Sequence, residues 1–568
     1  MRLFLLLFVL FIIGAFTGHK KEMSNEKVMR FSNSNIIYCA PSFDTLNLNK
    51  KAPLLKGLGT IRYSITTRSQ MAQKYFNQGL ALTYGFNHGE AARSFKTAIS
   101  LDSTCAMAYW GLALVLGPNY NAALNPTSLT DINFAIDNAI KYRHQVKENE
   151  RVLIDAISKR FPRQEVKDMT PYYEAYAARM KKAYDQFPTD IEIATLYADA
   201  LMNLHPWNLW LKDGTPQPWT PEIISHLEST LKQSPTHPGA IHYYIHATEA
   251  SKNVQKALPY ADKLVDAMPS AGHLVHMPSH TYIRTGEYHK GVLVNEKAAV
   301  ADSTYITQCK VQGAYPMLYY PHNIHFLAAC AFLEGNSKKA IEASWKVSAN
   351  ADRKYLHESV TVQHFFVIPY YTLVNLAKWE EILKLQKPGE LKYPVAIWHY
   401  ARGMAFSGQG NIEAAENELA IINRIAEDES LKSSLIWDLN SAQDLVHIAA
   451  FTLEGEIAAH KKEYDRAVEI LKKAIEKEDN LNYNEPPDWF FSVRHTLGHV
   501  LVQAGSFKEA EIIYKEDLST FPNNGWALRG LYNSLKGQGK NDEAGKVYDQ
   551  FKKAWKWADI TITSSRMY

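Results

Sequence analysis

Seven of the chain's 21 histidines are concentrated in one stretch near the middle of the sequence. His242 and His246 stand four residues apart, and Glu249 follows three residues later. Positions three and four residues apart lie on one face of a helix, so these side chains are expected to point the same way. The spacing of the two histidines recurs 34 residues later at His276 and His280. The pattern predicts a helical repeat that carries imidazoles on one face.

The histidine pattern extends into neighbouring repeats. In repeat register the histidines occupy positions 2, 5 and 9: His273 and His322 at position 2, His242, His276 and His325 at position 5, and His246 and His280 at position 9. These positions form one stripe of the first helix of each repeat, the stripe that faces the concave groove of such an array. Far downstream, His495 and His499 take positions 5 and 9 and are distant candidates for the same groove.

These side chains have the chemistry of a transition-metal site. Neutral imidazoles bind zinc, copper, iron and nickel, and a site with three protein ligands keeps positions open for water or substrate. The predicted metal ligands are His242, His246, Glu249, His276, His280 and His325. The expected cofactor is a divalent transition metal such as zinc, iron or copper. The HExxH motif of metalloproteases is absent, because the spacing here is HxxxHxxE.

The histidine pattern is also compatible with roles that need no metal. The rings could form hydrogen bonds and aromatic contacts within the repeats, or bind a polar ligand directly. Clustered imidazoles would also repel one another once protonated, which would make the groove pH-responsive. Random placement of the histidines would give about one pair at i, i+4, whereas the chain has three such pairs in one register.

Residues near the histidines are candidates for contacts to a ligand in the groove. Arg284 follows the HMPSH run and could bind an anion, although a charge on a helix surface has the same signature. Trp207 and Trp210 stand in an insertion before the histidine-rich repeats and could stack on a sugar or peptide side chain, although packing of the long insertion itself is the favoured use. His273 and His322 complete the predicted ligand groove.

Small residues recur at the offsets where the paired helices of tetratricopeptide repeats pack closely. A small residue is followed by a second one 12 positions later, by a larger side chain four positions after that, and by a further apolar residue three or four positions on. This pattern starts at Gly79, Gly403, Gly455 and Gly498. A small residue is needed where two helix axes approach, and a large one such as Phe95 fills the space beside it. The sequence therefore predicts an all-α fold, a tetratricopeptide-repeat solenoid of antiparallel helix pairs with loop insertions.

Two insertions flank the histidine-rich repeats, between Leu204 and Pro221 and between Ser303 and His322. Insertions in a solenoid form loops on one face, often the binding face, so these are expected to cover the groove. The predicted organisation is a signal peptide (1–18), an irregular N-terminal arm (19–69), an N-terminal repeat half with the histidine-rich groove (70–375) and a C-terminal repeat half with a capping helix (376–568).

The first residues predict export. Leu3 to Phe16 form an apolar run after Arg2 that is too short to span a bilayer comfortably and fits the core of a secretory signal. An uncleaved anchor is the alternative. The expected location is the periplasm or cell envelope of a bacterium, or the medium outside it, with no membrane span after cleavage. Of the cysteines, Cys309 and Cys330 are the closest pair that oxidation could join, and burial as free thiols is favoured over a disulfide.

Charge gives no sign of a nucleic-acid partner. Lys and Arg number 62 against 59 Asp and Glu, the net charge is +3, and no block of like charge stands out. Binding to nucleic acid or to an anionic membrane normally leaves a basic patch, so neither is predicted.

Five segments resemble one family of bacterial tetratricopeptide-repeat proteins: ALMNLHPWNLW, HPGAIHYYIHATEAS, AGHLVHMPSHTYIRTGEY, YYPHNIHF and PPDWFFSVRHTLGHVLVQAG. The resemblance spans about Gln70 to Asp559 and implies an all-helical solenoid without an assigned reaction. The family often has a Ser-Cys pair near the first repeat, where this chain has Arg68 and Ser69. Any role tied to that cysteine would be absent here.

The predicted function is that of an exported repeat scaffold. Repeat surfaces of this kind ordinarily serve recognition, so the groove is expected to bind a protein, a peptide or a small polar ligand, with a metal as an optional part. The alternative is a metal-dependent enzyme, a hydrolase or an oxidoreductase, with the histidines and Glu249 as ligands and the insertions excluding solvent.

Overall fold

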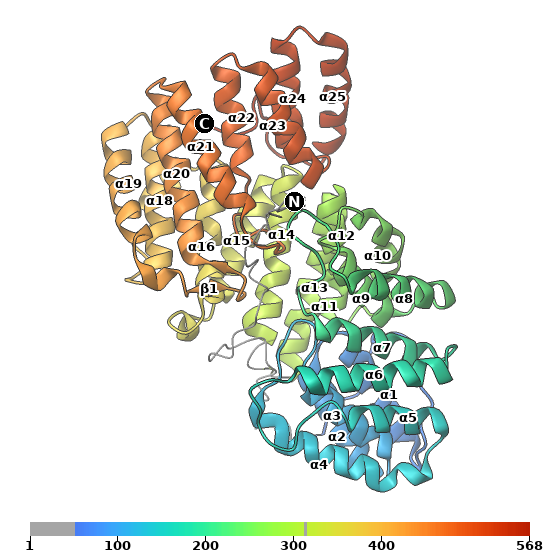
Figure 1. Ribbon diagram of the computed structural model, residues 1–568. Coiled ribbons are helices and arrows are strands. Elements are labelled where there is room, and N and C mark those ends of the chain that lie inside the picture. Colours follow the sequence, from blue (N-terminus) through green and yellow to red (C-terminus); the bar gives the residue numbers. More distant parts are fainter. Residues whose placement is uncertain (1–50, 310, 312–314) are drawn as a thin grey trace, which may run out of the picture. The chain divides into compact units, whose positions relative to one another are not determined.

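The computed structural model describes residues 51–309, 311 and 315–568, and this part of the chain is all-α apart from one short hairpin (Figure 1). The predicted signal peptide and most of the predicted arm lie outside the described residues. Helices that follow one another in the chain pack as neighbours, and the short turns between them make the pairs antiparallel. Within the described residues, no helix has the length and apolar character needed to cross a membrane.

The helices fall into three successive groups. The first group comprises α1 (Gln70–Tyr84), α2 (His88–Leu101), α3 (Ala106–Leu116), α4 (Leu129–Tyr142), α5 (Glu148–Ile157), α6 (Thr170–Gln186), α7 (Ile191–Leu204) and α8 (Thr220–Gln233). The histidine-rich group comprises α9 (Pro238–Thr248), α10 (Leu258–Leu264), α11 (Gly272–His276), α12 (Pro278–Thr285), α13 (Tyr288–Cys309), α14 (Tyr320–Leu333), α15 (Ser337–Asn350), α16 (Val360–Asn375) and α17 (Trp379–Lys384).

The C-terminal group is the most regular of the three. It comprises α18 (Lys392–Gly408), α19 (Ile412–Ala426), α20 (Ala442–His460), α21 (Tyr464–Asp479), α22 (Val493–Gln503), α23 (Phe507–Thr520), α24 (Gly525–Gly537) and α25 (Asn541–Ala554). The strands β1 (Leu435–Ile436) and β2 (Asn440–Ser441) form a small antiparallel hairpin before α20.

Close helix packing at glycines confirms the tetratricopeptide-repeat architecture. A Cβ atom added at Gly79 of α1 would lie 2.7 Å from the Phe95 ring of α2. One added at Gly498 of α22 would lie 2.5 Å from the Tyr514 ring of α23. Helix axes can approach this closely only where no side chain stands between them, and the aromatic ring fills the remaining space.

The histidine-rich group departs from the regular pattern. The sequence predicts one helix through His273, His276 and His280, but the structure has two, α11 and α12, that meet at Met277 and Pro278. Proline has no N–H to continue the helical hydrogen bonds, which explains the break. Helix α13 continues to Cys309, so the second insertion is shorter than the predicted one, which began at Ser303.

Cysteine oxidation plays no part in the described fold. Cys105, Cys309 and Cys330 are buried free thiols, so the alternative of a Cys309–Cys330 disulfide is wrong. Cys39 lies outside the described residues.

Residues 51–69 form no helix and lie extended on the first helix pair. The backbone N–H of Ala52 donates to Thr97 Oγ1 (3.0 Å), and that of Leu55 donates to Gln78 Oε1 (2.8 Å). Side chains of α1 and α2 thus satisfy backbone groups of the segment, as buried or half-buried backbone requires.

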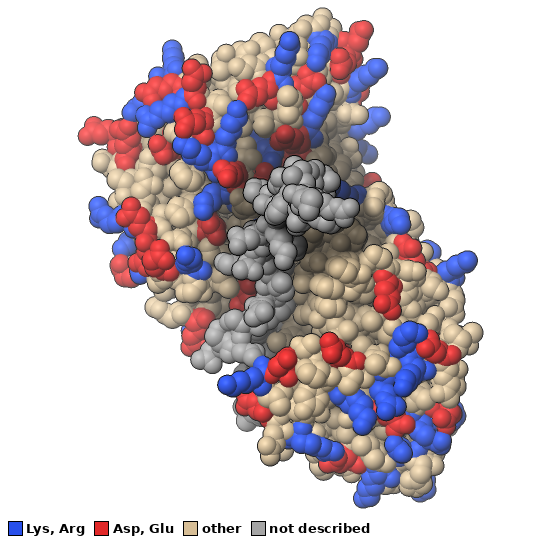
Figure 2. Space-filling model, in the orientation of Figure 1, with Lys and Arg blue, Asp and Glu red and all other residues tan. Residues whose placement is uncertain are grey.

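The last repeats pack back onto the histidine-rich group. Tyr288 OH donates to the Pro522 carbonyl (2.7 Å), and Trp526 Nε1 donates to the Phe332 carbonyl (3.1 Å). On the face shown in Figure 2, basic and acidic side chains are interspersed over the surface.

Candidate metal centre

Six histidines converge in two groups of three. The first triad consists of His242, His246 and His273, and the second triad consists of His276, His280 and His322. In each triad, one ring nitrogen from every histidine lies within 4.8 Å of the other two. Helices α9, α11, α12 and α14 supply these rings, so the centre joins three successive repeats.

In the first triad, the backbone of another repeat fixes one ring. His242 Nδ1 donates to the Tyr84 carbonyl oxygen at the end of α1 (2.7 Å). A carbonyl oxygen only accepts, so the proton of neutral His242 lies on Nδ1 and Nε2 carries a free lone pair. His273 Nε2 lies 3.2 Å from His242 Nε2, and His246 Nε2 is buried without a hydrogen-bond partner.

In the second triad, an asparagine fixes the ring of His276. Asn295 Nδ2 donates to the Gly291 carbonyl (2.8 Å), which turns its Oδ1 toward His276 Nδ1 (2.7 Å). The proton of His276 therefore lies on Nδ1. His276 Nε2 lies 3.0 Å from His280 Nε2.

Glu249 lies between the two triads. Its Oε1 accepts from His246 Nδ1 (2.9 Å), and its Oε2 forms an ion-pair contact of 2.6 Å with His280 Nδ1. One carboxylate thus contacts one ring of each triad at Nδ1, on the side of the ring away from Nε2. Metal-bound histidines typically give their second N–H to a carboxylate or carbonyl in this way. The sequence predicts Glu249 as a ligand, and the structure places it behind the ligands instead.

Burial lowers the pKa of most of these rings, which favours the neutral form that binds metals. His242, His246, His273, His276 and His280 are at most 2% exposed, and His322 is half-buried. Burial, reinforced by neighbouring imidazoles, lowers the pKa of His242 and His276 well below the usual value. Burial likewise lowers the pKa of His273 and His322. The pKa of Glu249 falls to about 2: burial opposes its ionisation, but His280 and His246 favour it more strongly.

Aromatic side chains enclose the triads. Phe86 lies against the first triad, with 4.4 Å between its ring centroid and that of His242. Phe326 lies against the second, 4.5 Å from the His280 ring. Trp207 stacks on Tyr120, whose ring lies 5.2 Å from His246, and Trp210 Nε1 donates to the Ala247 carbonyl (2.8 Å). Trp207 and Trp210 of the first insertion therefore cover α9 and the first triad, and the rings lie in the interior instead of along an open groove.

A loop from the C-terminal group reaches the edge of the second triad. Arg284 follows His280 by one helical turn, and its Nη1 lies 3.8 Å from Glu485 Oε1. Glu485 is 2% exposed, and burial raises its pKa to about 7. The distant candidates predicted from the sequence are His495 and His499, but the residues of this loop that contact Arg284 are Glu485 and Tyr483, whose ring faces Arg284 at 5.6 Å.

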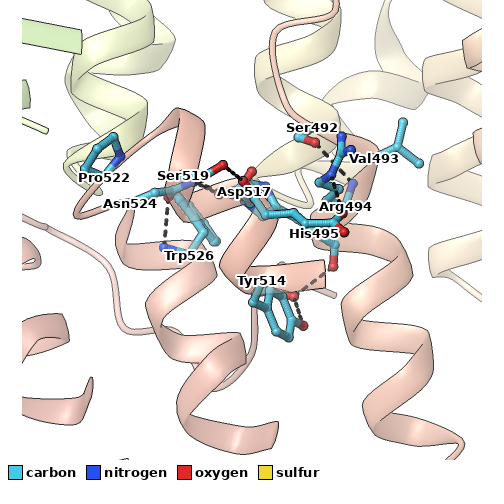
Figure 3. A network of polar contacts seen from close by, with 12 residues as sticks. Ser492, Val493, Arg494, His495, Tyr514, Asp517, Ser519, Pro522, Asn524 and Trp526 are labelled. Atoms are coloured by element: carbon cyan, nitrogen blue, oxygen red, sulfur yellow. Dashed lines mark hydrogen bonds and ion pairs between the residues drawn. The ribbon is translucent and has the colours of Figure 1, made fainter. Parts of the chain in front are cut away.

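Three predicted histidines lie outside both triads. His325 lies one turn further along α14 than His322 and packs against His364, with 5.8 Å between ring centroids. His495 belongs to a polar network of the last repeats (Figure 3), where its Nε2 lies 3.1 Å from Asp517 Oδ2 and 3.0 Å from Asn524 Nδ2. His499 lies against Tyr568 at 4.5 Å.

Comparisons with known proteins add little beyond the fold. No protein-family model and no curated protein matches the chain. Among solved structures, the human IFIT1 dimer with m7Gppp-AAAA is 13% identical, covers 86% of this chain and 91% of its own, and has a TM-score of 0.29. The yeast Tom70 structure is 12% identical over 84% of this chain and 90% of its own, with a TM-score of 0.27. Scores at this level carry no argument about ligand or partner.

Sequence reasoning missed the groups that hold the histidines in place. The Tyr84 carbonyl, Asn295, Phe86 and Phe326 have no spacing that links them to the HxxxH pairs. Only Asn295 carries a signal of such a role in the sequence. It stands in the middle of a helix, four residues after Gly291, and a buried amide there needs a polar partner inside the protein.

Proposed function

We propose that this chain is a helical-repeat protein that binds two transition-metal ions, one in each histidine triad. The observation that carries the proposal is the contact of 3.0 Å between His276 Nε2 and His280 Nε2. His276 Nδ1 donates to Asn295 Oδ1, so its Nε2 carries a lone pair, and the Glu249 carboxylate lies 2.6 Å from His280 Nδ1. With the His280 proton on Nδ1, beside the carboxylate, the Nε2 lone pairs of His276 and His280 face each other, an arrangement that a bound cation stabilises.

The spacing of the ring nitrogens supports the same conclusion. Two nitrogens bound to one tetrahedral ion at about 2.0 Å lie about 3.3 Å apart. The Nε2 atoms of His242 and His273 are 3.2 Å apart, and those of His276 and His280 are 3.0 Å apart. His246 and His322 complete the two sets of three. Glu249 and Asn295 hold the rings from behind, as residues around metal ligands do.

The proposal is tested by metal analysis of the full chain without a histidine tag. After reconstitution with zinc, copper or iron and removal of excess, the wild type is expected to retain two ions per chain. A double variant, His242→Ala with His276→Ala, is expected to retain none. A wild type without stoichiometric metal after all three reconstitutions would end the proposal.

An enzymatic role is the second candidate, favoured by the number of ligands. Three protein ligands leave coordination positions open, as in catalytic zinc sites, whereas structural zinc sites use four.

Export, predicted from Leu3 to Phe16, and a protein or peptide partner of the repeats remain predictions. Processing of the exported chain can be tested by N-terminal sequencing of the purified protein.

A further inference from the structure

The donor set of the proposed centre contains no anion. Both triads offer imidazole nitrogen alone, and within the described part of the chain Glu249 is the acid that pairs with these rings. Both of its oxygens face Nδ1 atoms, on the side of the ring away from the Nε2 atoms that would bind the ion. Each ion would therefore be held by three neutral donors.

The charged side chains next to the triads can offset little of the positive charge that two bound ions would bring. Glu485 lies beside Arg284 next to the second triad and so contributes no excess negative charge there, which leaves the single negative charge of Glu249. Two divalent ions would bring four positive charges into this interior, and two monovalent ions would bring two. The cost of burying an ion rises steeply with its charge, and the aromatic walls of Phe86 and Phe326 offer no compensation.

We infer that the centre is a copper site that holds two cuprous ions, one in each triad; this rests on the metal-binding function proposed above. Imidazole is a good ligand for copper. Cuprous ion is monovalent and is satisfied by three donors, so it needs no further anion. Zinc or ferrous ion in the same site would have to recruit hydroxide or another anion to offset its second charge.

The test is a competition between two metals on the full-length wild type. Metal-free protein is titrated without oxygen, with cuprous ion buffered by ascorbate and bathocuproine disulfonate, and separately with zinc against a coloured chelator. The expected result is two equivalents of cuprous ion, held at least about 100-fold more tightly than zinc, which is about 2.7 kcal/mol in binding free energy. Zinc held as tightly as cuprous ion, or more tightly, would overturn the copper inference and leave the metal-binding proposal intact. Binding of neither metal would overturn the copper inference, and failure to bind iron as well would overturn the metal-binding proposal.

A matched pair of variants assigns the ions to the triads. His276→Gln is expected to lose one of the two cuprous equivalents, while His357→Gln, at an exposed histidine outside the centre, is expected to keep both. X-ray absorption of the copper-loaded wild type needs no variant and is expected to show three nitrogen neighbours per ion. A sulfur neighbour, or two equivalents retained by His276→Gln, would contradict the assignment.

Discussion

The regular C-terminal repeats and the histidine-rich repeats use the same helix pairing for different purposes. Where α22 meets α23, Gly498 admits the Tyr514 ring, and the contact is aromatic packing anchored by a hydrogen bond of 2.7 Å between Tyr514 OH and Ser565 Oγ. Where α9, α11 and α12 meet, the interior holds imidazoles, a carboxylate and an amide. The repeat architecture tolerates this polar interior because Glu249 and Asn295 orient the rings.

The two regions also differ in what their buried side chains contribute: the aromatic rings contribute to stability and the imidazoles to metal binding. Burying an aromatic ring in a close helix contact stabilises the fold, whereas burying several neutral imidazoles costs free energy unless their nitrogens find partners. His246, His273 and His322 each have a ring nitrogen that is buried and has no hydrogen-bond partner. We therefore expect changes in the C-terminal repeats to alter stability alone, and changes in the triads to alter metal binding first.

Removing one ligand from each triad should have the largest effect. His242→Ala with His280→Ala leaves two imidazoles in each site, so metal content is expected to fall from two ions per chain to none. The free energy of unfolding of the metal-free protein should change far less than the metal affinity. Elemental analysis and urea unfolding, run on the same samples, measure the two quantities. Loss of stability with full metal retention would reverse the contrast between the two regions.

Glu249→Gln should weaken both sites without removing a ligand. The amide can still accept a hydrogen bond from one ring, but it no longer supplies a charged acceptor for the Nδ1 atoms of His246 and His280. Loss of such a supporting residue costs about 10- to 100-fold in metal affinity. Competition with a chelator measures the change at each site. An effect confined to one site would show that Glu249 does not link the triads.

Gly498→Ala should destabilise the regular repeats. The new methyl group would lie 2.5 Å from the Tyr514 ring, and overpacking of this kind costs about 1 to 3 kcal/mol. The matched control is Gly545→Ala in α25, where no atom lies within 4 Å and the alanine should be neutral or slightly stabilising. Urea unfolding measures both. Metal content of the folded Gly498→Ala protein is expected to equal that of the wild type.

The last prediction concerns the pH dependence of stability and a buried histidine outside the triads. Burial lowers the pKa of His364 to about 3, whereas its pKa in the unfolded chain is about 6.5. Below pH 6.5 the unfolded chain binds the extra proton, so this histidine makes stability fall as pH falls from 6.5 toward 3, by about 1.4 kcal/mol per pH unit. His364→Gln should reduce that slope between pH 6.5 and 4.5, and His357→Gln at an exposed site should leave it unchanged. Urea unfolding at several pH values would decide, and equal slopes in wild type and His364→Gln would contradict the assignment.

The fold could be predicted because its signals are local. The small residues at Gly79, Gly455 and Gly498 recur at fixed offsets, and those offsets follow from the distance between paired helices. The i, i+4 spacing likewise placed His242 with His246, and His276 with His280. Predictions failed where a break changed the geometry: Pro278 ends the expected helix, and α13 runs on to Cys309.

The division of the histidines into two triads could not be predicted in full, because it depends on how each helix is rotated about its axis relative to its neighbours. His322 and His325 are one turn apart on α14, and the repeat register predicts His325 as a metal ligand and His322 as part of the wider groove. The structure places His322 in the second triad and His325 against His364. The supports are equally non-local: the Tyr84 carbonyl is 158 residues from His242, and Glu485 comes from a separate group of repeats.

The most direct measurement is a crystal structure of the metal-loaded wild type, with data collected on both sides of the metal's absorption edge. The account predicts two anomalous peaks. One should lie about 2.0 Å from ring nitrogens of His242, His246 and His273, and the other at the same distance from those of His276, His280 and His322. Two peaks elsewhere on the chain, or triads without a peak in protein soaked with copper and with zinc, would contradict it.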